Sequence, residues 1–171
     1  MHDASTDALS PVQRIARALF SEDAIYGLIL VSGLIVVSGT LTGESVGAFV
    51  TVFVTVAVFW AAHVYARTLS QYSRAGVDHN LRLALVAALR ESSGMLIVAV
   101  PPLLVLLAGL TGILPDEAAI MGALVLDVLL LALVGWIAVA RWSQSTMARV
   151  GGALMTAAFG AVLIAAKALI H

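Results

Sequence analysis

Three side chains that can bind a cation stand at the same end of the first two apolar segments of this chain. Glu22 and Asp23 open the first segment, and His63 lies near the close of the second. Because a four-residue connection joins the two segments into a hairpin, His63 can face Asp23. Carboxylate oxygens and an imidazole nitrogen suit Fe(II), Mn(II) or Co(II). The sequence therefore predicts a divalent-metal site built from Asp23, Glu22 and His63.

The same residues also fit a purely structural interpretation. Acidic residues in the first turn of a helix are stabilised by the helix dipole, and Ser21 is placed to cap that helix. His63 and Tyr65, near the end of the second segment, are typical of residues at a membrane–water interface. Both interpretations are open at this point.

Asp127 is a second candidate for chemistry, because it interrupts the fourth apolar segment near its middle. An ionisable group inside a bilayer costs at least ~2.5–3.5 kcal/mol and needs a partner or a purpose. Lys167 on the fifth segment lies roughly 8 Å away in depth at ~1.5 Å per residue, which a lysine can bridge if the two helices touch. The sequence predicts a buried Asp127–Lys167 pair that locks two helices, or alternatively a protonated Asp127 or a proton relay along a transport path.

Five long apolar segments carry these side chains. Roughly 18 or more apolar residues are enough to cross ~30 Å of hydrocarbon as a helix. The segments that reach this length are about 24–41, 46–66, 95–113, 118–140 and 150–170. We therefore expect an all-α polytopic membrane protein with five transmembrane helices and short interfacial amphipathic helices, forming a single integral membrane domain over residues 1–171.

Little of the chain lies outside these segments. Residues 1–10 are polar and predict a disordered tail, and the amphipathic pattern of residues 11–20 predicts a helix on the membrane surface. The cytoplasmic connection expected at 67–93 has room for short helices but not for a domain. Asn80 belongs to a sequence that can cap a helix running to about Arg90.

Two patterns inside the apolar segments concern packing. Pro101 and Pro102 lack backbone N–H groups, which frees carbonyls in the preceding turn and predicts a kink. Freed carbonyls can bind a cation, although a neighbouring hydroxyl or a water satisfies them more often. Gly152, Thr156 and Gly160 recur every four residues and predict a smooth ridge on which another helix packs closely.

The positions of the basic residues predict the orientation. Eight of the nine Lys and Arg residues lie before the first segment or in the second and fourth connections, which all fall on one side of a five-span topology. Short loops rich in these residues stay in the cytoplasm. We therefore expect a cytoplasmic N-terminus and a C-terminus outside, with Lys167 as the one exception. The bias towards Ala, Val, Leu and Arg favours a bacterial cytoplasmic membrane.

Composition limits the alternatives. Hydrophobic residues make up 61% of the chain and charged residues 11%, which excludes an ordinary soluble domain. The net charge of −1 argues against a nucleic-acid partner, which would require a basic surface. Without cysteine the chain forms no disulfide and no thiolate metal site. Sequence motifs of nucleotide-binding proteins, zinc proteases and serine hydrolases are missing. A membrane enzyme is a third possibility, but it would need a cluster of His and acidic residues at one interface, and the sequence offers only His63 with Glu22 and Asp23, plus His79. We therefore expect no enzyme.

Several short sequences resemble the vacuolar iron transporter family, whose members have five spans. The family's Asn-Asp-Gly-Ile opening of the first span is similar to residues 22–25. Its Ala-Ala-Gly-Glu-Tyr end of the second span is similar to residues 61–65, and the start of its Pro-Leu-Leu-Pro sequence to residues 102–104. Gly135 and Gly160 fall where the last two spans of the family carry glycine. The resemblance implies exchange of a divalent metal for protons.

The chain also departs from that family. Asp23 corresponds to the family's Asp, but Val64 replaces the Glu of the second span, and Phe59 or Trp60 replaces the preceding Met. The Glu-rich metal-binding insert between spans two and three is missing, since only residues 67–93 lie there. Either the chain is a reduced relative with another cargo, or the shared layout reflects only how five helices pack.

Two classes of function follow from these patterns. The first is a small secondary transporter or cation permease, a homodimer in the lipid bilayer, with Asp23 and His63 at its inner mouth, Asp127 deeper along the path, and a divalent metal as cargo rather than as a cofactor. The second is a non-transporting structural or assembly protein whose polar side chains only hold helices together. Movement of protons or divalent cations by the protein in liposomes would divide the two.

Overall fold

The computed structural model of the chain describes residues 22–41, 43–74 and 80–170, and the side chains of residues 40, 74, 166–168 and 170 lie outside that description. The predicted tail and surface helix, residues 1–20, also lie outside the described residues, as does Ser21. Each element in the described part is a helix, which confirms the all-α class. The helices are α2 (Glu22–Leu41), α3 (Ser45–Arg74), α4 (Leu81–Glu91), α5 (Ser93–Leu110), α6 (Asp116–Ala140) and α7 (Thr146–Ile170).

Five helical stretches are long and apolar enough to cross a membrane. Four of them belong to α2, α3, α6 and α7. The remaining stretch, Leu81–Leu110, joins α4 to α5 across a one-residue break at Ser92. Helix α5 stays helical through Pro101 and Pro102. The apolar segments seen in the sequence therefore correspond to five membrane-length helical stretches.

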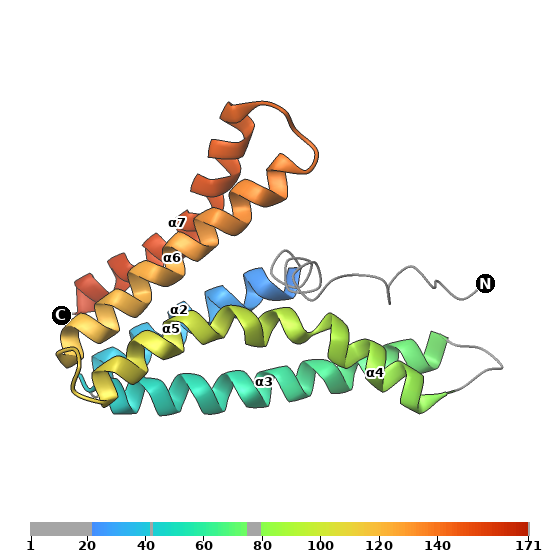
Figure 1. The fold of residues 1–171 in the computed structure, drawn as a ribbon, viewed down its shortest axis with the longest axis horizontal. Helices are drawn as coiled ribbons and strands as arrows, with labels where there is room; N and C mark the ends of the chain where they lie inside the picture. Colours follow the sequence, from blue (N-terminus) through green and yellow to red (C-terminus); the bar gives the residue numbers. More distant parts are fainter. Residues whose placement is uncertain (1–21, 42, 75–79, 171) are drawn as a thin grey trace.

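Helix α3 is longer than the apolar segment that predicted it. The apolar residues end near position 66, but α3 continues to Arg74 because neither proline nor glycine interrupts residues 67–74. Its 30 residues span about 45 Å. Helix α4 contacts α3 and folds back along this extension (Figure 1). As the capping sequence predicted, α4 begins after Asn80, whose side chain accepts a hydrogen bond from the backbone N–H of Leu83.

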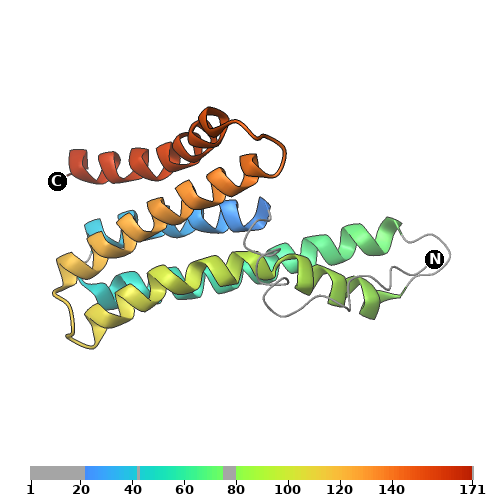
Figure 2. The ribbon, with the colours of Figure 1, turned by 45° about the horizontal axis from the view of Figure 1, so that its top comes forward.

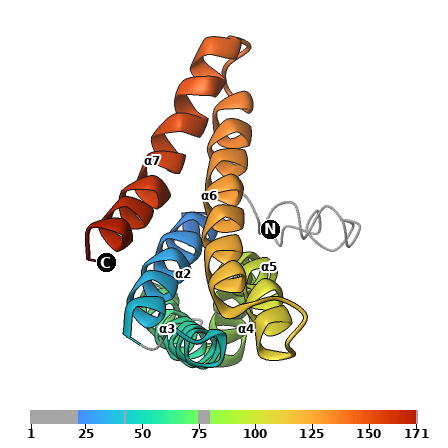
Figure 3. The same cartoon turned by 90° about the vertical axis from the view of Figure 1, so that its left-hand side faces the viewer.

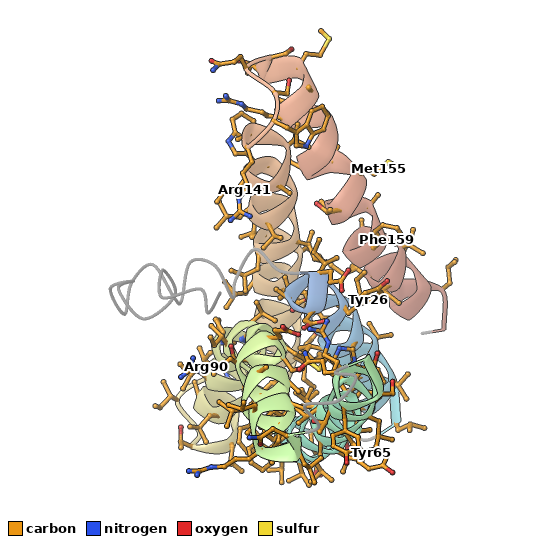
Figure 4. All side chains as sticks on the ribbon, turned by 90° about the vertical axis from the view of Figure 1, so that its right-hand side faces the viewer. Tyr26, Tyr65, Arg90, Arg141, Met155 and Phe159 are labelled. Atoms are coloured by element: carbon orange, nitrogen blue, oxygen red, sulfur yellow. The ribbon has the colours of Figure 1, made fainter. Side chains whose placement is uncertain are left out.

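Helix α2 lies at the centre of the molecule. It contacts α3, α5, α6 and α7, and more of its span is buried than of any other. Helix α3 runs alongside α4 and α5, whereas α6 and α7 form a pair that leaves the other helices at an angle (Figures 1 and 2). Viewed from one end, α6 and α7 rise out of the group formed by α2, α3, α4 and α5 (Figure 3). Helix α7 has the smallest buried share of the five stretches, with exposed Met155 and Phe159 on its outer side (Figure 4).

Glycines make the contact between α6 and α7. A Cβ atom added to Gly135 would collide with the Thr156 hydroxyl and the Gly152 backbone, and one added to Gly160 would collide with side chains of α6. The hydroxyl of Thr156 donates a hydrogen bond to the carbonyl of Leu131 at 2.7 Å. The ridge predicted on the fifth span is therefore the surface that packs on α6.

Two groups of buried apolar side chains fill the interior at different levels of α2. The group nearer the start of α2, here called the Leu28 cluster, consists of Ala24, Leu28, Val98, Leu131 and Val134. The group nearer its end, here called the Ile35 cluster, consists of Val31, Ile35, Val36, Ala48, Val52, Val56, Ala99, Leu106, Ile120, Ala123 and Leu124. Both clusters draw side chains from α2, α5 and α6, so these three helices share one core.

Candidate functional site

The structure brings Asp23 and His63 together at the first turn of α2. Nε2 of His63 lies 3.1 Å from Oδ1 of Asp23. The side chain of Asp23 is almost completely buried, whereas that of Glu22 in the same turn is largely exposed. Both acids lie where the helix dipole stabilises negative charge. Two adjacent acids therefore have different surroundings, and Asp23 is the one that contacts His63.

Arg67 on α3 connects these residues to a third helix. Its Nη2 atom lies 2.8 Å from Oδ1 of Asp23 and 3.3 Å from Oε1 of Glu22. Its Nη1 atom lies 3.2 Å from Oε2 of Glu91 on α4. Gln71 donates a hydrogen bond to the same Glu91 oxygen at 3.0 Å. These contacts join five residues, here called the Arg67 cluster: Glu22, Asp23, His63, Arg67 and Glu91.

Sequence reasoning treated Arg67 only as a marker of orientation. A signal for its role was present, because Arg67 follows His63 by four residues and so shares its face of the helix. The participation of Glu91 had no such signal. It depends on α4 folding back along α3, and the hydrophobic pattern does not specify that arrangement.

One nitrogen of His63 faces both a donor and an acceptor. Nε of Arg67 donates a hydrogen bond to Nε2 of His63 at 3.1 Å, and Oδ1 of Asp23 is equally far from the same atom. A ring nitrogen with a free lone pair can accept from Arg67, and a protonated one can donate to Asp23. Nε2 of His63 can therefore bond to only one of the two neighbours at a time, and the tautomer of the ring decides which.

Arg67 also bears on the predicted metal site. Within the described ranges, no group of three or more His, Asp or Glu side chains is placed to hold a metal ion. The guanidinium already occupies Oδ1 of Asp23 and approaches the lone pair of His63 that would bind a metal. Oδ2 of Asp23 is buried and has no hydrogen-bond partner among the described residues. A divalent ion at Asp23, Glu22 and His63 would therefore have to displace Arg67, and the metal site stays a prediction.

Asp127 lies at the level between the two apolar clusters. Its side chain is fully buried near the middle of α6, and its Oδ2 atom accepts a hydrogen bond from the hydroxyl of Ser32 on α2. Its Oδ1 atom has no hydrogen-bond partner in the part of the chain that the structure describes. Sequence reasoning singled out Asp127 but not Ser32, because that contact depends on how α2 and α6 cross.

The side chain of Lys167, the partner predicted for Asp127, lies outside the described part of the structure. The backbone register still bears on the pair. Thr156 bonds to Leu131, and Gly160 packs against the same turn of α6. Extending this antiparallel register places Asp127 level with about residue 162, five residues or about 7.5 Å from Lys167 along the axis. This offset agrees with the depth expected from the sequence, and the ion pair itself stays a prediction.

At the far end of α2, Asp116 caps a neighbouring helix. Its Oδ1 atom accepts hydrogen bonds from the backbone N–H of Ser45, at 3.0 Å, and from the hydroxyl of Ser45. Ser45 is the first residue of α3, whose first-turn N–H groups have no partner within the helix. Gly109 of α5 packs here too, since an added Cβ would press on Ser45 and Ala119. This contact fastens α3, α5 and α6 together.

The comparisons with known proteins give no relative from which to infer a function. No family model, curated protein or solved structure matches this chain. The resemblance to vacuolar iron transporters therefore stays a prediction from the sequence. The geometry of the polar side chains is the basis for a functional proposal.

Three of the polar contacts between helices lie at three different levels of the helix group. Asp23 and the Arg67 cluster occupy one end, Asp127 with Ser32 the middle, and Asp116 with Ser45 the other end. Ser32 follows Asp23 by nine residues on α2, or about 14 Å, and Asp127 follows Asp116 by eleven on α6, or about 16 Å. The Leu28 cluster separates the first two levels and the Ile35 cluster the last two. The central carboxyl is thus enclosed by apolar side chains on both sides.

Proposed function

We propose that this chain is an integral membrane protein that acts as a small secondary transporter or cation permease, with Asp127 as the residue that binds the transported ion or the coupling proton. The observation that carries the proposal is the fully buried carboxyl of Asp127, which has one hydroxyl partner, Ser32, and one oxygen without a partner among the described residues. A carboxyl at mid-depth in a membrane protein is costly, and such groups mark ion and proton pathways.

The surface of the helices supports insertion into a membrane. Large apolar side chains are exposed on several helices, for example Phe53 on α3, Leu129 on α6 and Phe159 on α7. An exposed apolar surface of this extent is stable against lipid chains and not against water. The concentration of arginine near the Arg67 end supports a cytoplasmic position for that end.

The two ends of the helix group fit the role of gates. The Arg67 cluster joins α2, α3 and α4 at the cytoplasmic end, and Asp116 with Ser45 joins α6 to α3 at the outer end. An ion that reaches Asp127 from either side has to pass one of these contacts and one apolar cluster. Contacts that join the helices at both ends support an occluded form in the proposed transport cycle.

The cargo need not bind where the sequence first indicated. A divalent metal can use Asp23, Glu22 and His63 only after Arg67 has moved away from Asp23. In a metal–proton exchanger, entry of the metal would therefore be linked to release of Arg67 towards Glu91. Exchange of a divalent metal for protons is the activity that the resemblance to vacuolar iron transporters implies.

Flux measurements test the proposal. The full chain is reconstituted into liposomes that contain a pH-sensitive dye, and movement of protons, Na+ and Mn(II) is followed under an imposed gradient. We expect flux above that of protein-free liposomes, most of which is lost in Asp127→Asn and kept in Glu117→Gln, a matched change at an exposed acid of the same helix. Wild-type flux equal to that of empty liposomes for every ion would overturn the transport proposal.

A structural or assembly role is the second candidate, and the Arg67 cluster favours it. One guanidinium binds carboxylates from two other helices, which is what a protein built only to hold its helices together requires. In that case Asp127→Asn should leave the liposomes as impermeable as the wild type does. Its effect would be confined to stability.

A further inference from the structure

We propose that Asp127 and Ser32 form a binding site for a dehydrated monovalent cation, completed by backbone carbonyls of α5 that the two prolines leave without helical donors. The inference rests on the proposed function in taking Asp127 as the ion-binding residue, and it adds the class of ion and the remaining ligands. Na+ is the cation whose binding we would measure.

The first support is the second carboxylate oxygen of Asp127. Its Oδ1 atom is buried without a hydrogen-bond partner among the described residues, while Oδ2 accepts from Ser32. A hydroxyl that donates its one hydrogen still has lone pairs to offer. Both side chains can therefore bind a cation without breaking the contact between them.

The second support comes from α5, which remains helical through Pro101 and Pro102. Neither proline has an N–H group, so the carbonyls of Ile97 and Val98 lack the donors that the next helical turn would supply. Carbonyls freed in this way inside a membrane protein are satisfied by a neighbouring group or line an ion site. Buried oxygen atoms of this kind suit a hard cation such as Na+.

The level of these carbonyls matches that of Asp127. Val98 packs with Leu28 and Leu131, and the next residue, Ala99, belongs to the other apolar cluster together with Val31 and Leu124. Asp127 lies between Leu124 and Leu131 on α6, and Ser32 follows Val31 on α2. The freed part of α5, the hydroxyl and the carboxyl thus all lie near the level at which the two clusters adjoin.

Helices α2 and α5 pack closely beside the freed carbonyls, at Gly27, five residues before Ser32 on α2. A Cβ atom added to Gly27 of α2 would lie 3.0 Å from the Val98 side chain and 3.1 Å from the Met95 backbone. Helix α2 therefore approaches α5 closely at the turn that holds the freed carbonyls. Contacts of α6 with both α2 and α5 complete the three sides of the site.

The charge of the site favours a monovalent ion. One carboxylate neutralises one positive charge, whereas a divalent ion would keep a net charge between two apolar clusters, which is costly. No set of three acidic or histidine side chains that could hold a metal ion occurs in the described ranges. A hydrated ion would also have to keep its water among apolar side chains, so the ion binds in its dehydrated form.

Thermal unfolding of the purified full chain in detergent tests the site. The unfolding midpoint is measured in NaCl and in choline chloride at equal ionic strength. We expect Na+ to raise the midpoint by roughly 2–4 °C at saturation. This rise should disappear in Asp127→Asn and Ser32→Ala and persist in Glu117→Gln, an exposed acid on the same helix.

Variants that restore the missing backbone N–H donors test the site without destabilising the fold. Pro101→Ala and Pro102→Ala each supply an N–H group to the preceding turn and favour the helix. We expect both to keep or raise the midpoint in choline chloride while the Na+ effect shrinks. Equal midpoints of the wild type in the two salts, or the same Na+ effect in Asp127→Asn, would overturn the proposal. A Na+ effect that appears only in Lys167→Met would also overturn the proposal, since Lys167 would then form an ion pair with Asp127 in the wild type.

Parallel flux assays separate this inference from the transport proposal. Flux in liposomes that depends on Asp127, without any Na+ effect on unfolding, would overturn the Na+ site and leave transport standing. A Na+ effect that depends on Asp127, with no flux of any ion, would keep the site and overturn transport.

Discussion

The guanidinium of Arg67 on α3 holds the buried carboxylate of Asp23 on α2, with 2.8 Å between Nη2 and Oδ1, and binds Glu91 on α4 through its other terminal nitrogen. Three helices thus meet at one side chain. The positive charge of Arg67 is thus paired with the Asp23 carboxylate in the first turn of α2. A cation that bound Asp23 would have to compete with Arg67.

Removing Arg67 should destabilise the fold. In Arg67→Gln the buried Asp23 loses its cationic partner, and we expect a loss of about 1.5–3 kcal/mol in unfolding free energy. Thermal unfolding in detergent measures the change. Arg82→Gln, at an exposed arginine of α4, is the matched control and should change the midpoint little. Equal effects of the two substitutions would mean that the contacts of Arg67 contribute nothing.

A side chain added at Gly135 should destabilise the contact between α6 and α7. An added Cβ meets the Thr156 hydroxyl and the Gly152 backbone, so Gly135→Ala should separate the helices and cost about 1–3 kcal/mol. Gly151→Ala provides the control, because nothing lies within 4 Å of its added Cβ. We expect Gly151→Ala to leave the unfolding midpoint unchanged or slightly higher. A midpoint of Gly135→Ala as high as that of the control would contradict the close contact.

Asp116 of α6 should stabilise the fold by capping the start of α3. Asp116→Ala removes the acceptor for both the backbone N–H and the hydroxyl of Ser45, and we expect a lower unfolding midpoint. Glu117→Ala changes the neighbouring exposed acid and should have little effect. Hydrogen exchange at the start of α3 gives a local measurement. Exchange at Ser45 should become faster in Asp116→Ala alone, and unchanged protection there would argue against the cap.

Asp127 and Lys167 should compensate each other if their side chains meet. Asp127→Asn or Lys167→Met alone would then leave one charge unpaired and lower the midpoint, and the double substitution would restore much of the loss. The antiparallel register leaves about 7.5 Å of depth for the lysine to bridge. Strictly additive effects in this double-mutant cycle would show that the two groups are independent, which would favour Asp127 as an ion-binding residue.

Orientation can be tested with single cysteines, since the chain has none of its own. Ile113→Cys lies in the turn between α5 and α6, and Gln144→Cys in the turn between α6 and α7, at two exposed positions. A membrane-impermeant thiol reagent added to intact cells should label the first and not the second. The opposite pattern would invert the topology, and labelling of both would contradict a fixed orientation.

The sequence predicted what depends on one segment at a time. The length of the apolar segments predicted the five membrane-length stretches, and Asn80 predicted the start of α4. Two contacts between segments also followed from local patterns: a tight connection brings His63 to Asp23, and a small-residue ridge packs α7 on α6. The bond between Ser32 and Asp127 requires a particular crossing of α2 and α6, and no periodicity in a single helix specifies a crossing. The reach of Arg67 to Glu91 requires the fold-back of α4 in the same way.

The length of α3 gives the lipid headgroups a part in the gate proposed at the Arg67 end. Arg67 follows Ser45 by twenty-two residues, or about 33 Å, close to the ~30 Å thickness of a hydrocarbon core. With Ser45 at one boundary of the bilayer, the guanidinium reaches the depth of the phosphates in the opposite leaflet. Phospholipid phosphates are then a second set of anions within reach, beside Asp23 and Glu91. In such a bilayer, the anionic lipid content of that leaflet would set how firmly Arg67 stays on the protein's own carboxylates.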